Sequence, residues 1–593
     1  MYSDKININI LTSLLVAHRI RHAVVCPGSR NAPIVHNLSE HPNIMCYPVT
    51  DERSAGFFAL GMAQATRQAV AVCVTSGSAL LNLAPAVAEA HEQHLKIVVI
   101  SADRPQRWIE QLDGQTLPQP KAFNTLVNKS VSLPENIFNE EDHWHCNRLV
   151  NEALLATRFP ADGPVHINVP IAEPLFGFTV EELSEERVIH RCFEGCDGTQ
   201  VARWILEAKR PMVVMGQYVS DMHMYDNDTR RKALELLDAL GVVLSERLCN
   251  FPLQTIHTDE AIALVEGQEE YMPDLIVYFG GTVVSKRLKQ FMRRAKEAKV
   301  VMINQDGLIH DVSMHLTDVV QMRNVEELFY ALLDIYNAKP GHENSPTQKL
   351  TNLKTQELNN SPTHEFHSKW ARVLSFASNV ADNYQPAFSQ MSTVKYFEEQ
   401  LTDMEYDYHV HYANSSPIRL ANIFAGQPVY CNRGVNGIEG SLSTAAGFAA
   451  ATDDNVFCVI GDLSFFYDQN ALWNQNLKGN LRIMLLNNGG GGIFSNLKGL
   501  EQSGAQRKFV AGEHHTQARG ICAQNDIGYL CARNIEEMQI GVVTLLTKET
   551  KRPMLLEVLT DIEADTKAIN DYYQQMIQLW QKENGKPSGN SRR

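Results

Sequence analysis

The sequence lacks the features that mark several large classes of protein. Its apolar stretches, such as residues 96–100, have the length of a strand and fall far short of the roughly 20 residues that cross a bilayer. The first residues, MYSDKININI, contain neither the basic nor the apolar region of a signal peptide. Basic residues are scarce relative to acidic ones, and the formal net charge of −15 argues against nucleic acid or an anionic membrane as a main partner.

Signatures of zinc and dinucleotide sites are missing as well. Cys192 and Cys196 have no second cysteine pair nearby, and His91 and His94 are too close together to form an HExxH motif. No complete GxGxxG motif follows an expected strand, which disfavours an NAD(P)-dependent dehydrogenase. Eleven cysteines, an odd number scattered along the chain, indicate reduced thiols and therefore a cytoplasmic protein.

The length of 593 residues exceeds what one hydrophobic core usually organises, which predicts about three domains. Apolar strands alternate with helical stretches such as residues 53–66 and 79–91, a pattern typical of parallel sheets buried between helices. The expected strands form three sets: residues 22–26, 70–75, 96–101 and 165–169; residues 212–216, 275–280 and 300–303; and residues 428–431, 456–460, 481–486 and 553–559.

We therefore expect an α/β protein with three doubly wound parallel-sheet domains. A charged stretch near residues 181–198 and a polar stretch rich in Pro, Asn, Ser and Thr after residue 337 provide the boundaries. The expected units are an N-terminal domain (1–185), a central domain (195–340), a linker (341–370), a C-terminal domain (371–580) and a disordered tail (581–593).

Polar residues follow two strands of the third set. Asp462 comes after the strand at residues 456–460, and Asn488 comes after the strand at residues 481–486, just before four glycines. If a helix beginning near Tyr467 joins these strands, their carboxyl ends are neighbours, and ligands of open parallel sheets bind there. The Asp462 carboxylate, the Asn488 amide oxygen and the Gly490 carbonyl would then offer hard oxygen ligands to Mg²⁺ or Mn²⁺, with a diphosphate as a further ligand.

This arrangement resembles the signature of thiamine-diphosphate enzymes, Gly-Asp followed about 25–30 residues later by Asn-Asn. The alternatives are a flexible glycine linker and a chance pairing of a Gly-Asp turn with a glycine loop. The third position of the signature is Leu463, where many members of the class have glycine.

Two further residues acquire a role through this resemblance. In such enzymes a glutamate of the N-terminal unit hydrogen-bonds N1′ of the aminopyrimidine, and Glu52, at a strand–helix junction, is the candidate. The alternative is that Asp51 and Glu52 simply favour the positive end of the following helix. Ile438, flanked by glycines before a helix at residues 443–451, is the candidate for the apolar residue that supports the bent cofactor, although it could also belong to the core.

Basic residues recur at the expected strand ends of this acidic protein and suit the binding of carboxylates. They are Arg30 in CPGSRNAP, Arg104 in SADRP, Lys286 and Arg287 in SKRL, Arg419 in NSSPIR and Arg433 in CNRG.

Nine stretches between residues 27 and 497 resemble the 2-succinyl-5-enolpyruvyl-6-hydroxy-3-cyclohexene-1-carboxylate synthase family of menaquinone biosynthesis. They occur in family order: PGSRNAP, DERSAGFFALG, VTSGSALLNLAPAVAEA, SADRP, SKRL, ANSSPIRL, NRGVNGIEGSLSTAAG, GDLSFFYDQNAL and NNGGGGIFSNL. Leu463 fits the Gly-Asp-Leu-Ser variant of that family, while the stretch around Gln115 departs from its usual pattern.

The resemblance implies an enzyme that decarboxylates 2-oxoglutarate on thiamine diphosphate and adds the succinyl carbanion to isochorismate in a Stetter-type 1,4-addition. Its three domains would be pyrimidine-binding, central and diphosphate-binding. It also implies a homodimer or homotetramer, in which Glu52 of one subunit reaches the cofactor held by Asp462 and Asn488 of its neighbour. Neither nucleic acid nor a membrane is expected as a partner.

The resemblance assigns roles to residues that match the family motifs. The implied catalytic residues are Glu52, Ser29, Arg30, Gln115 and Arg419. The implied cofactor-binding residues are Glu52, Ser76, Gly77, Ser415, Ile438, Ser464, Asn488 and Ile493. The implied metal ligands are Asp462, Asn488 and Gly490. Substrate binding falls to Arg30, Arg104, Lys286, Arg287, Asn414, Ser415, Arg419, Arg433, Phe494 and Leu497.

Other functions remain open at this point. Acetolactate synthase would bind FAD in the central unit, whose short glycine segments at Gly216 and Gly280 form no clear fingerprint. Many 2-oxo acid decarboxylases carry a His-His pair early in the chain, whereas His514 and His515 lie in the third unit. A non-catalytic protein that kept the fold would not need intact Glu52, Asp462 and Asn488.

Overall fold

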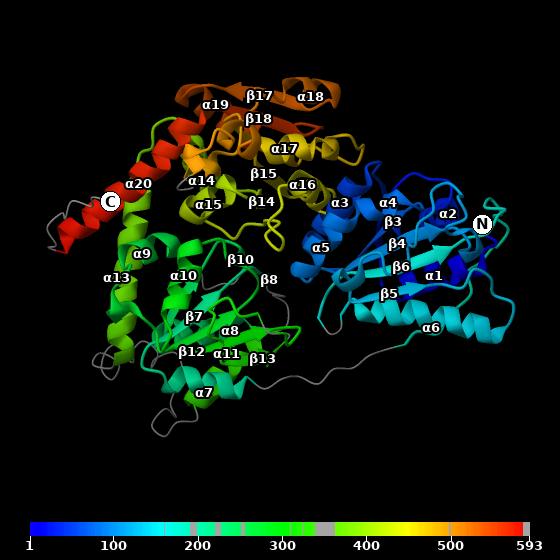
Figure 1. Cartoon of the computed structure of the whole chain (residues 1–593), viewed down its shortest axis with the longest axis horizontal. Helices are drawn as coiled ribbons and strands as arrows, with labels where there is room; N and C mark the ends of the chain where they lie inside the picture. Colours follow the sequence, from blue (N-terminus) through cyan, green and yellow to red (C-terminus); the bar gives the residue numbers. More distant parts are fainter. Residues whose placement is uncertain are drawn as a thin grey trace.

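The computed structural model describes residues 1–158, 161–189, 198–219, 227–250, 255–308, 310–322, 324–337, 362–496 and 500–584. These residues form three α/β domains, coloured blue to cyan, green, and yellow to red along the chain (Figure 1). Each contains a parallel sheet, as the sequence predicts, but with five or six strands rather than the three or four that the sequence indicated.

The N-terminal domain is built on a six-stranded sheet with the order β2-β1-β3-β4-β6-β5. Its strands are β1 (His22–Val25), β2 (Met45–Pro48), β3 (Val70–Val74), β4 (Ile97–Asp103), β5 (Lys129–Ser132) and β6 (Val165–Pro170). Its helices are α1 (Ile6–Ala17), α2 (Ala32–Glu40), α3 (Glu52–Thr66), α4 (Ser78–Asn82), α5 (Ala84–Glu92) and α6 (Glu140–Ala156).

The central domain has a five-stranded sheet with the order β13-β12-β11-β7-β9. Its strands are β7 (Pro211–Met215), β9 (Val242–Ser245), β11 (Leu275–Phe279), β12 (Lys299–Asn304) and β13 (Asp318–Gln321), with a separate short pair β8 (Tyr218–Val219) and β10 (Cys249–Asn250). Its helices are α7 (Thr199–Glu207), α8 (Asn227–Leu240), α9 (Thr258–Leu264), α10 (Lys286–Arg294), α11 (Glu326–Asn337) and α13 (Pro362–Asn383).

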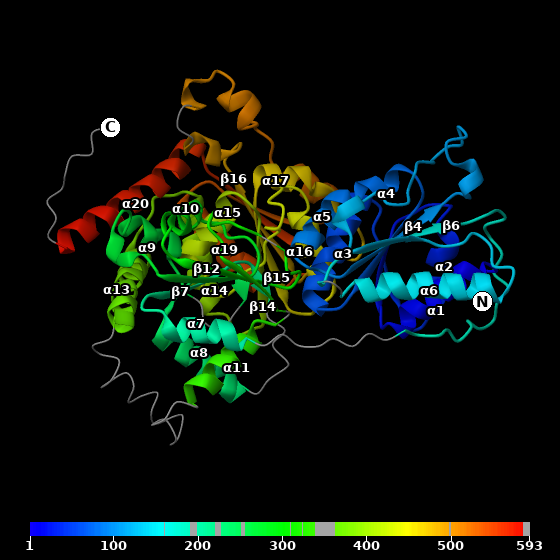
Figure 2. The same cartoon turned by 60° about the horizontal axis from the view of Figure 1, so that its bottom comes forward.

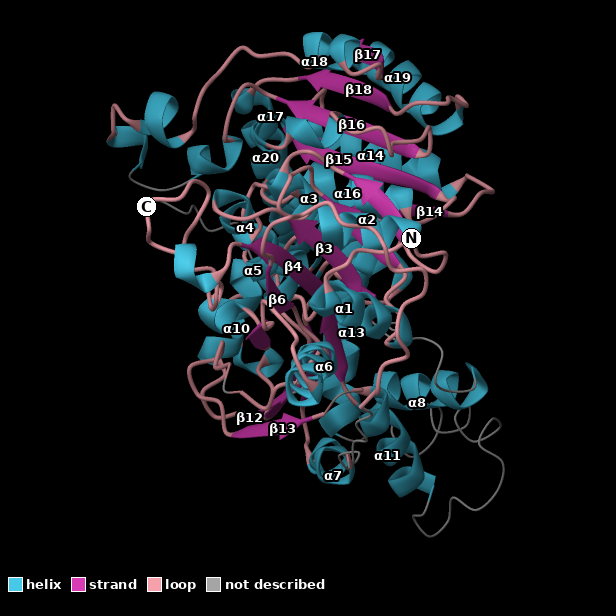
Figure 3. Cartoon of the chain, turned by 90° about the vertical axis from the view of Figure 1, so that its right-hand side faces the viewer, coloured by secondary structure: helices cyan, strands magenta, loops and turns pink. Residues whose placement is uncertain are grey.

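The C-terminal domain has a five-stranded sheet with the order β14-β15-β16-β18-β17, whose strands lie side by side in Figure 3. These strands are β14 (Tyr408–Tyr412), β15 (Asn455–Gly461), β16 (Leu481–Asn487), β17 (Gly528–Ala532) and β18 (Met554–Leu559). The helices are α14 (Gln390–Thr402), α15 (Ser416–Phe424), α16 (Ser441–Ala450), α17 (Asp462–Tyr467), α18 (Arg519–Gln524), α19 (Ile535–Thr547) and α20 (Ile562–Glu583).

Successive side chains of each strand point to opposite faces of the sheet and pack into different hydrophobic clusters. Each sheet is therefore covered on both faces. In β7, for example, Met212 and Val214 belong to one buried cluster, and Val213 and Met215 belong to another. A strand that is buried on both faces reads as a continuous apolar run, which is why the central strands were visible in the sequence. The doubly wound architecture is therefore confirmed.

The N-terminal and C-terminal domains pack through α3 and α16, which lie next to each other in Figures 1 and 2. Glycines occupy the crossing point of the two helices. A Cβ on Gly61 would lie 1.9 Å from the Thr444 carbonyl oxygen, and one on Gly447 would lie 2.0 Å from that of Phe58. Bare backbone therefore allows contact closer than any side chain would permit, and it sets how the two domains meet.

Four local predictions are wrong. Residues 428–431 form no strand but one isolated bridge between Tyr430 and His411, because β14 takes the edge of the sheet. The helix after β15 begins at Asp462 rather than near Tyr467. The predicted linker and tail also overlap helices, since α13 begins at Pro362 and α20 continues to Glu583.

The first of these helices was hidden by its polar surface. Phe366, Trp370, Val373 and Ala377 of α13 are buried at helical spacing, and α13 packs against α8 and α9 of the central domain. Residues 341–361 of the predicted linker and residues 585–593 of the predicted tail lie outside the described residues. Among the described helices, none combines the length and apolar character needed to cross a membrane.

Candidate functional site

Asp462 and Asn488 lie at neighbouring strand ends, as the sequence predicts. β15 and β16 are parallel and paired, with Gly461 opposite Leu486. Asp462 is the residue directly after Gly461, and Asn488 comes two residues after Leu486. The pairing therefore brings the two predicted metal ligands to one edge of the sheet.

The Asp462 carboxylate points at the glycine run. Its Oδ2 accepts hydrogen bonds from the backbone N–H groups of Gly489 at 2.8 Å and Gly490 at 2.9 Å, and its Oδ1 accepts one from Leu463. The residue is 4% exposed, and burial raises the pKa of the carboxyl group, although His514 and the backbone N–H groups oppose this. His514 Nε2 lies 3.3 Å from Asp462 Oδ2.

The two asparagines before the glycines have different environments. Asn487 is buried, and its Nδ2 donates to the carboxylate of Glu557 at 2.8 Å and to the Thr516 carbonyl at 2.9 Å. Asn488 is more open, and its Nδ2 donates to Asp565 Oδ2 at 2.8 Å. No hydrogen bond from a described residue reaches Asn488 Oδ1, so this oxygen is the atom available to a ligand. Asn487 is thus structural, and Asn488 faces the site.

These groups fit a hard divalent cation with a diphosphate. A buried carboxylate held by backbone donors, an amide oxygen with its nitrogen already engaged, and a carbonyl on bare backbone are suitable oxygen donors. Gly489 and Gly490 have φ angles of +83° and +158°, the first of which favours glycine. Within the described ranges no group of three or more His, Cys, Asp and Glu side chains could hold a metal, and the predicted donor set contains one such residue, Asp462.

A second group of polar residues lies in the C-terminal domain, next to Glu246 of the central domain. The Asn414 amide oxygen accepts from Arg433 Nη1 at 3.1 Å, and its nitrogen donates to the Gly437 carbonyl at 2.7 Å. Burial lowers the pKa of Arg433, the charge of Arg419 lowers it further, and Glu246 opposes both. Arg419 and Arg433 are therefore close enough to repel each other, which is the arrangement expected of a receptor for a dianion.

Glu246 interacts both with Arg433 of this group and with the backbone just before α10. Its carboxylate accepts from the backbone N–H groups of Val284 and Ser285, and burial raises its pKa to about 7. The next residue, Lys286, has an exposed side chain. Arg287 differs, because its guanidinium is paired with Asp259 and lies 4.7 Å from the centre of the Tyr573 ring.

The predicted residues of the N-terminal domain gather at the carboxyl edge of its sheet. Glu52 is the first residue of α3, after β2, and its Oε2 accepts from Asn82 Nδ2 at 3.3 Å. Ser76 and Gly77 follow β3 and are buried. A Cβ on Gly77 would lie 3.1 Å from the backbone of Gln115, whose own φ is +56°. The structure therefore brings Gln115 against the loop after β3.

Arg30 and Arg104 follow β1 and β4 of the same sheet. Arg30 is 6% exposed, and it donates to the Ile171 carbonyl at 3.0 Å and to Glu173 at 3.1 Å. Arg104 Nε lies 2.9 Å from Asp113 Oδ2. Both guanidinium groups partly offset the effect of burial, which raises the pKa of Asp103.

The remaining predicted residues are less constrained. Ser29 and Ile438 are exposed, the latter with 41% of its surface open. Ser415 has a φ of +76° at the start of α15, and Ser464 is buried in α17. Ile493 and Phe494 follow the glycines and are half-buried, whereas Leu497 lies outside the described residues.

The predicted residues thus form two groups within one chain. One comprises the N-terminal sheet edge with Glu52, and the other comprises the C-terminal sheet edge with Asp462 and the neighbouring cations. No hydrogen bond or ion pair among the described residues joins a predicted member of the first group to a predicted member of the second. The domains themselves are linked nearby, where Arg53 donates to the Tyr467 carbonyl at 2.9 Å.

Three residues that support the site were missed. Asp565 of α20 orients Asn488, Glu246 holds the backbone just before α10, and Gln119 connects the loop after β3 to the sheet. The Gln119 side chain accepts from Gly77 N at 2.7 Å and donates to Asn168 Oδ1 at 2.8 Å. In the sequence each reads as an ordinary polar or helix-capping residue, and no spacing rule marks it.

Comparisons with known proteins identify the fold. Residues 8–124 match the family model described as "Thiamine pyrophosphate enzyme, N-terminal TPP binding domain". A thiamine diphosphate-dependent 4-hydroxybenzoylformate decarboxylase of Rhodococcus jostii has a similar fold, with a TM-score of 0.67, 17% identity, and coverage of 94% of this chain and 99% of that chain. The fold is therefore that of thiamine-diphosphate enzymes.

Curated relatives narrow the identity to one family. A 2-succinyl-5-enolpyruvyl-6-hydroxy-3-cyclohexene-1-carboxylate synthase of Bacteroides thetaiotaomicron is 43% identical over 98% of this chain and 100% of its own length. A synthase of the same name from Phocaeicola vulgatus is 43% identical over 97% and 99%, and one from Desulfotalea psychrophila is 34% identical over 88% and 93%. The chain therefore belongs to the 2-succinyl-5-enolpyruvyl-6-hydroxy-3-cyclohexene-1-carboxylate synthase family.

Proposed function

We propose that the enzyme decarboxylates 2-oxoglutarate on thiamine diphosphate and adds the remaining succinyl unit to isochorismate, forming 2-succinyl-5-enolpyruvyl-6-hydroxy-3-cyclohexene-1-carboxylate for menaquinone biosynthesis. The observation that carries the proposal is the near full-length similarity to synthases of that name. The Asp462–Asn488 geometry supports it independently, because it suits a cation with a diphosphate.

The cofactor would be held at the edge of the C-terminal sheet. Asp462, Asn488 and the Gly490 carbonyl are the proposed ligands of Mg²⁺ or Mn²⁺, and the cation in turn would hold the diphosphate. Thiamine diphosphate, when bound, supplies the electron sink that decarboxylation requires. Ile438 is proposed to support the bent cofactor, which agrees with its exposed side chain, and Glu52 is proposed to hydrogen-bond N1′ of the aminopyrimidine.

The substrates carry carboxylates that need cationic partners in an acidic protein. Arg419 and Arg433 are proposed to bind them beside the cofactor, with Lys286 at the start of α10 as a third cation. Arg30, Arg104 and Gln115 are proposed to contribute from the N-terminal domain. Arg287 could bind a substrate carboxylate only if its ion pair with Asp259 were broken.

We propose a homodimer or larger homo-oligomer in which each active site combines two subunits. Among the described residues, no hydrogen bond or ion pair joins the predicted group of Glu52 to that of Asp462. Apolar side chains near both groups are also exposed: Leu81 by 48%, Ile438 by 41%, Tyr467 by 50% and Trp473 by 57%. A second copy of the chain would cover such surface and complete the site.

The reaction is tested by mixing the protein with thiamine diphosphate, Mg²⁺, 2-oxoglutarate and isochorismate and following the loss of isochorismate absorbance. We expect loss that depends on every component. No loss, together with turnover of pyruvate alone, would instead favour an acetolactate synthase or a decarboxylase.

The shared site is tested by complementation. Glu52→Gln and Asp462→Asn chains, each inactive alone, are co-expressed with different tags. If each site combines Glu52 of one subunit with Asp462 of the other, a mixed dimer has one intact site, and the random mixture should recover about a quarter of wild-type activity. If each site lies within one chain, the mixture stays inactive, which would refute the proposal.

A cytoplasmic location is also proposed. The nine cysteines found within the described ranges are all free thiols, as expected for a reducing compartment. Labelling of intact cells with a membrane-impermeant thiol reagent, followed by labelling after lysis, tests this. Modification of Cys46 or Cys531, which are partly exposed, before lysis would contradict it.

A further inference from the structure

Glu89 is a buried carboxylate to which the site described above gives no role. It lies in α5 of the N-terminal domain and is 3% exposed. Its Oε1 accepts from the backbone N–H of Gly434 at 2.9 Å, and its Oε2 accepts from the backbone N–H of Val435 at 2.8 Å. One side chain of the N-terminal domain therefore holds two successive backbone donors of the C-terminal domain, directly after Arg433.

The segment that Glu89 holds contains Arg433, a proposed partner of a substrate carboxylate. Arg433 donates from Nη1 to the Asn414 amide oxygen at 3.1 Å. The Asn414 amide nitrogen donates to the carbonyl of Asn432 and to that of Gly437, the latter at 2.7 Å. Asn414 thus anchors the segment near its two ends, and Glu89 supplies the anchor between them.

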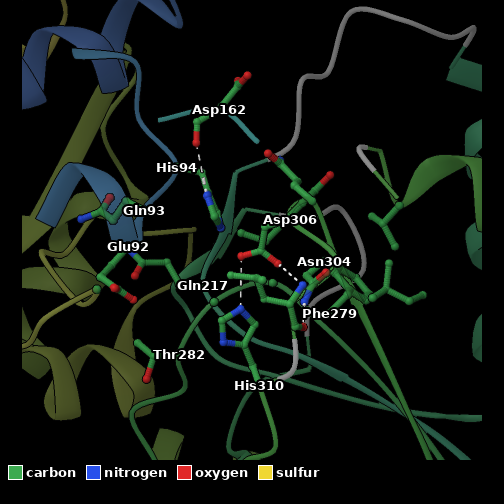
Figure 4. Close-up of a pocket in the computed structure, with 18 of the residues that line it drawn as sticks. Glu92, Gln93, His94, Asp162, Gln217, Phe279, Thr282, Asn304, Asp306 and His310 are labelled. Atoms are coloured by element: carbon green, nitrogen blue, oxygen red, sulfur yellow. Dashed lines mark hydrogen bonds and ion pairs between the residues drawn. The ribbon is translucent and has the colours of Figure 1, made fainter. Parts of the chain in front are cut away.

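Helix α5 approaches this segment so closely that the contact requires glycine. A Cβ on Gly434 would lie 2.6 Å from Glu92 Cβ and 3.3 Å from Glu89 Oε1. The first distance is too short for two carbon atoms, so any side chain there would push the segment away from α5. Glu92 and Gln93, at the end of α5, and Gln217 of the central domain surround a cavity that Gly434 also lines (Figure 4).

The backbone before Arg433 is held as well. The Cys431 carbonyl accepts from Gln217 Nε2 at 2.8 Å and from Gln93 Nε2 at 3.3 Å. Gln93 Nε2 also donates to Glu89 Oε1. The other two domains therefore fix the backbone on both sides of Arg433, and Glu89 supplies the only charged group among these contacts.

Glu89 also acts on the charge of Arg433. Burial lowers the pKa of Arg433, and the neighbouring Arg419 lowers it further, whereas the carboxylates of Glu246 and Glu89 favour the charged guanidinium. A guanidinium binds a carboxylate through charge-assisted hydrogen bonds, so it has to keep its charge in this buried place. A neutral amide at position 89 would offer one acceptor oxygen instead of two and no negative charge.

We propose that Glu89 is a positioning residue of the substrate site, which holds the backbone after Arg433 so that the guanidinium meets a substrate carboxylate. The inference rests on the proposed function and adds to it a residue that touches neither substrate nor cofactor. Because Asn414 anchors Gly437 independently, the neighbouring Ile438 keeps its place without Glu89. Glu89 therefore acts on the affinity for a substrate and not on the affinity for the cofactor.

The test compares the steady-state kinetics of the wild-type holoenzyme with those of Glu89→Gln. We expect KM for one of the two substrates to rise about ten-fold or more, since a hydrogen bond to a charged group is lost. The fall in kcat should be smaller than the rise in KM, and the calorimetric Kd of thiamine diphosphate should stay unchanged. Glu92→Gln is the matched control, because Glu92 ends the same helix and makes no hydrogen bond or ion pair with a described residue.

Two measurements separate positioning from a general structural role. Arg433→Ala should raise KM for the same substrate, and adding Glu89→Gln to it should have little further effect, because both residues act through one group. Glu89→Asp keeps the charge and both acceptor oxygens on a shorter side chain, so its KM should lie between those of the wild type and Glu89→Gln.

Hydrogen exchange tests the contact without catalysis. In the cofactor-free protein, the amides of Gly434 and Val435 should exchange faster in Glu89→Gln than in the wild type. Unchanged exchange, an unchanged KM, equal weakening of substrate and cofactor, or additive effects with Arg433→Ala would each overturn the proposal. An inactive wild type would refute the proposed function itself, whereas an effect missing only from Glu89→Gln would refute this inference alone.

Discussion

Asp565 provides the sharpest test of how the metal site is held. This aspartate of α20 accepts from Asn488 Nδ2 at 2.8 Å, from Gln390 N at 2.7 Å and from the Thr560 hydroxyl at 2.9 Å. Its contact with Asn488 fixes which end of that amide faces the proposed cation. In Asp565→Asn an amide nitrogen can stand where Oδ2 accepts, so two NH₂ groups would oppose each other and the Asn488 amide would turn.

The size of the effect follows from the bond that is lost. A hydrogen bond to a charged group contributes about 1.5–3 kcal/mol, and a turned Asn488 would present NH₂ instead of oxygen to the cation. Loss of an outer partner of a metal ligand typically lowers metal affinity about 10–100-fold, which corresponds to about 1.4–2.7 kcal/mol. The two estimates agree.

The assay is a calorimetric titration of the protein with thiamine diphosphate at a fixed concentration of Mg²⁺. We expect the Kd of Asp565→Asn to rise about 10–100-fold, while turnover at saturating cofactor and Mg²⁺ falls much less. Asp561→Asn is the matched control, since Asp561 caps the same helix by accepting from Ala564 N at 2.8 Å and does not contact Asn488. Wild-type affinity in Asp565→Asn, or equal weakening in Asp561→Asn, would refute the reasoning.

Three other substitutions test separate parts of the molecule. Glu52→Gln should abolish turnover while calorimetry still detects cofactor binding, and near-normal activity would remove Glu52 from its proposed role. Gln119→Leu leaves the buried Gly77 N–H unpaired at a cost of about 1–3 kcal/mol, so the KM for thiamine diphosphate should rise, whereas exposed Gln111→Leu should leave it unchanged. Burial raises the pKa of Asp468 from 3.8 to about 6, so its ionised form costs the folded state about 3 kcal/mol above that pH. Asp468→Asn should therefore raise the melting temperature more at pH 8 than at pH 5, and a difference independent of pH would contradict this.

The fold class and the ligand-bearing strand ends were predictable because both depend on local pattern. Strands buried on both faces, such as β3 and β11, are continuous apolar runs, and the polar residue that follows such a strand marks a sheet edge. Asp462 and Asn488 were found in this way. Half-exposed edge strands such as β5 and β13 mix polar and apolar residues, so no comparable pattern marks them.

What the sequence determined by itself was therefore the three parallel sheets, the residues at their carboxyl ends and the family. The tertiary structure decided which of the two asparagines faces the site, that Asp565 and Gln119 hold it, and that Arg287 is already paired. It also showed that Glu246 accepts from the backbone N–H groups of Val284 and Ser285, just before α10. These contacts join residues far apart in the chain, and a buried polar side chain acquires its partner only when packing brings the two together.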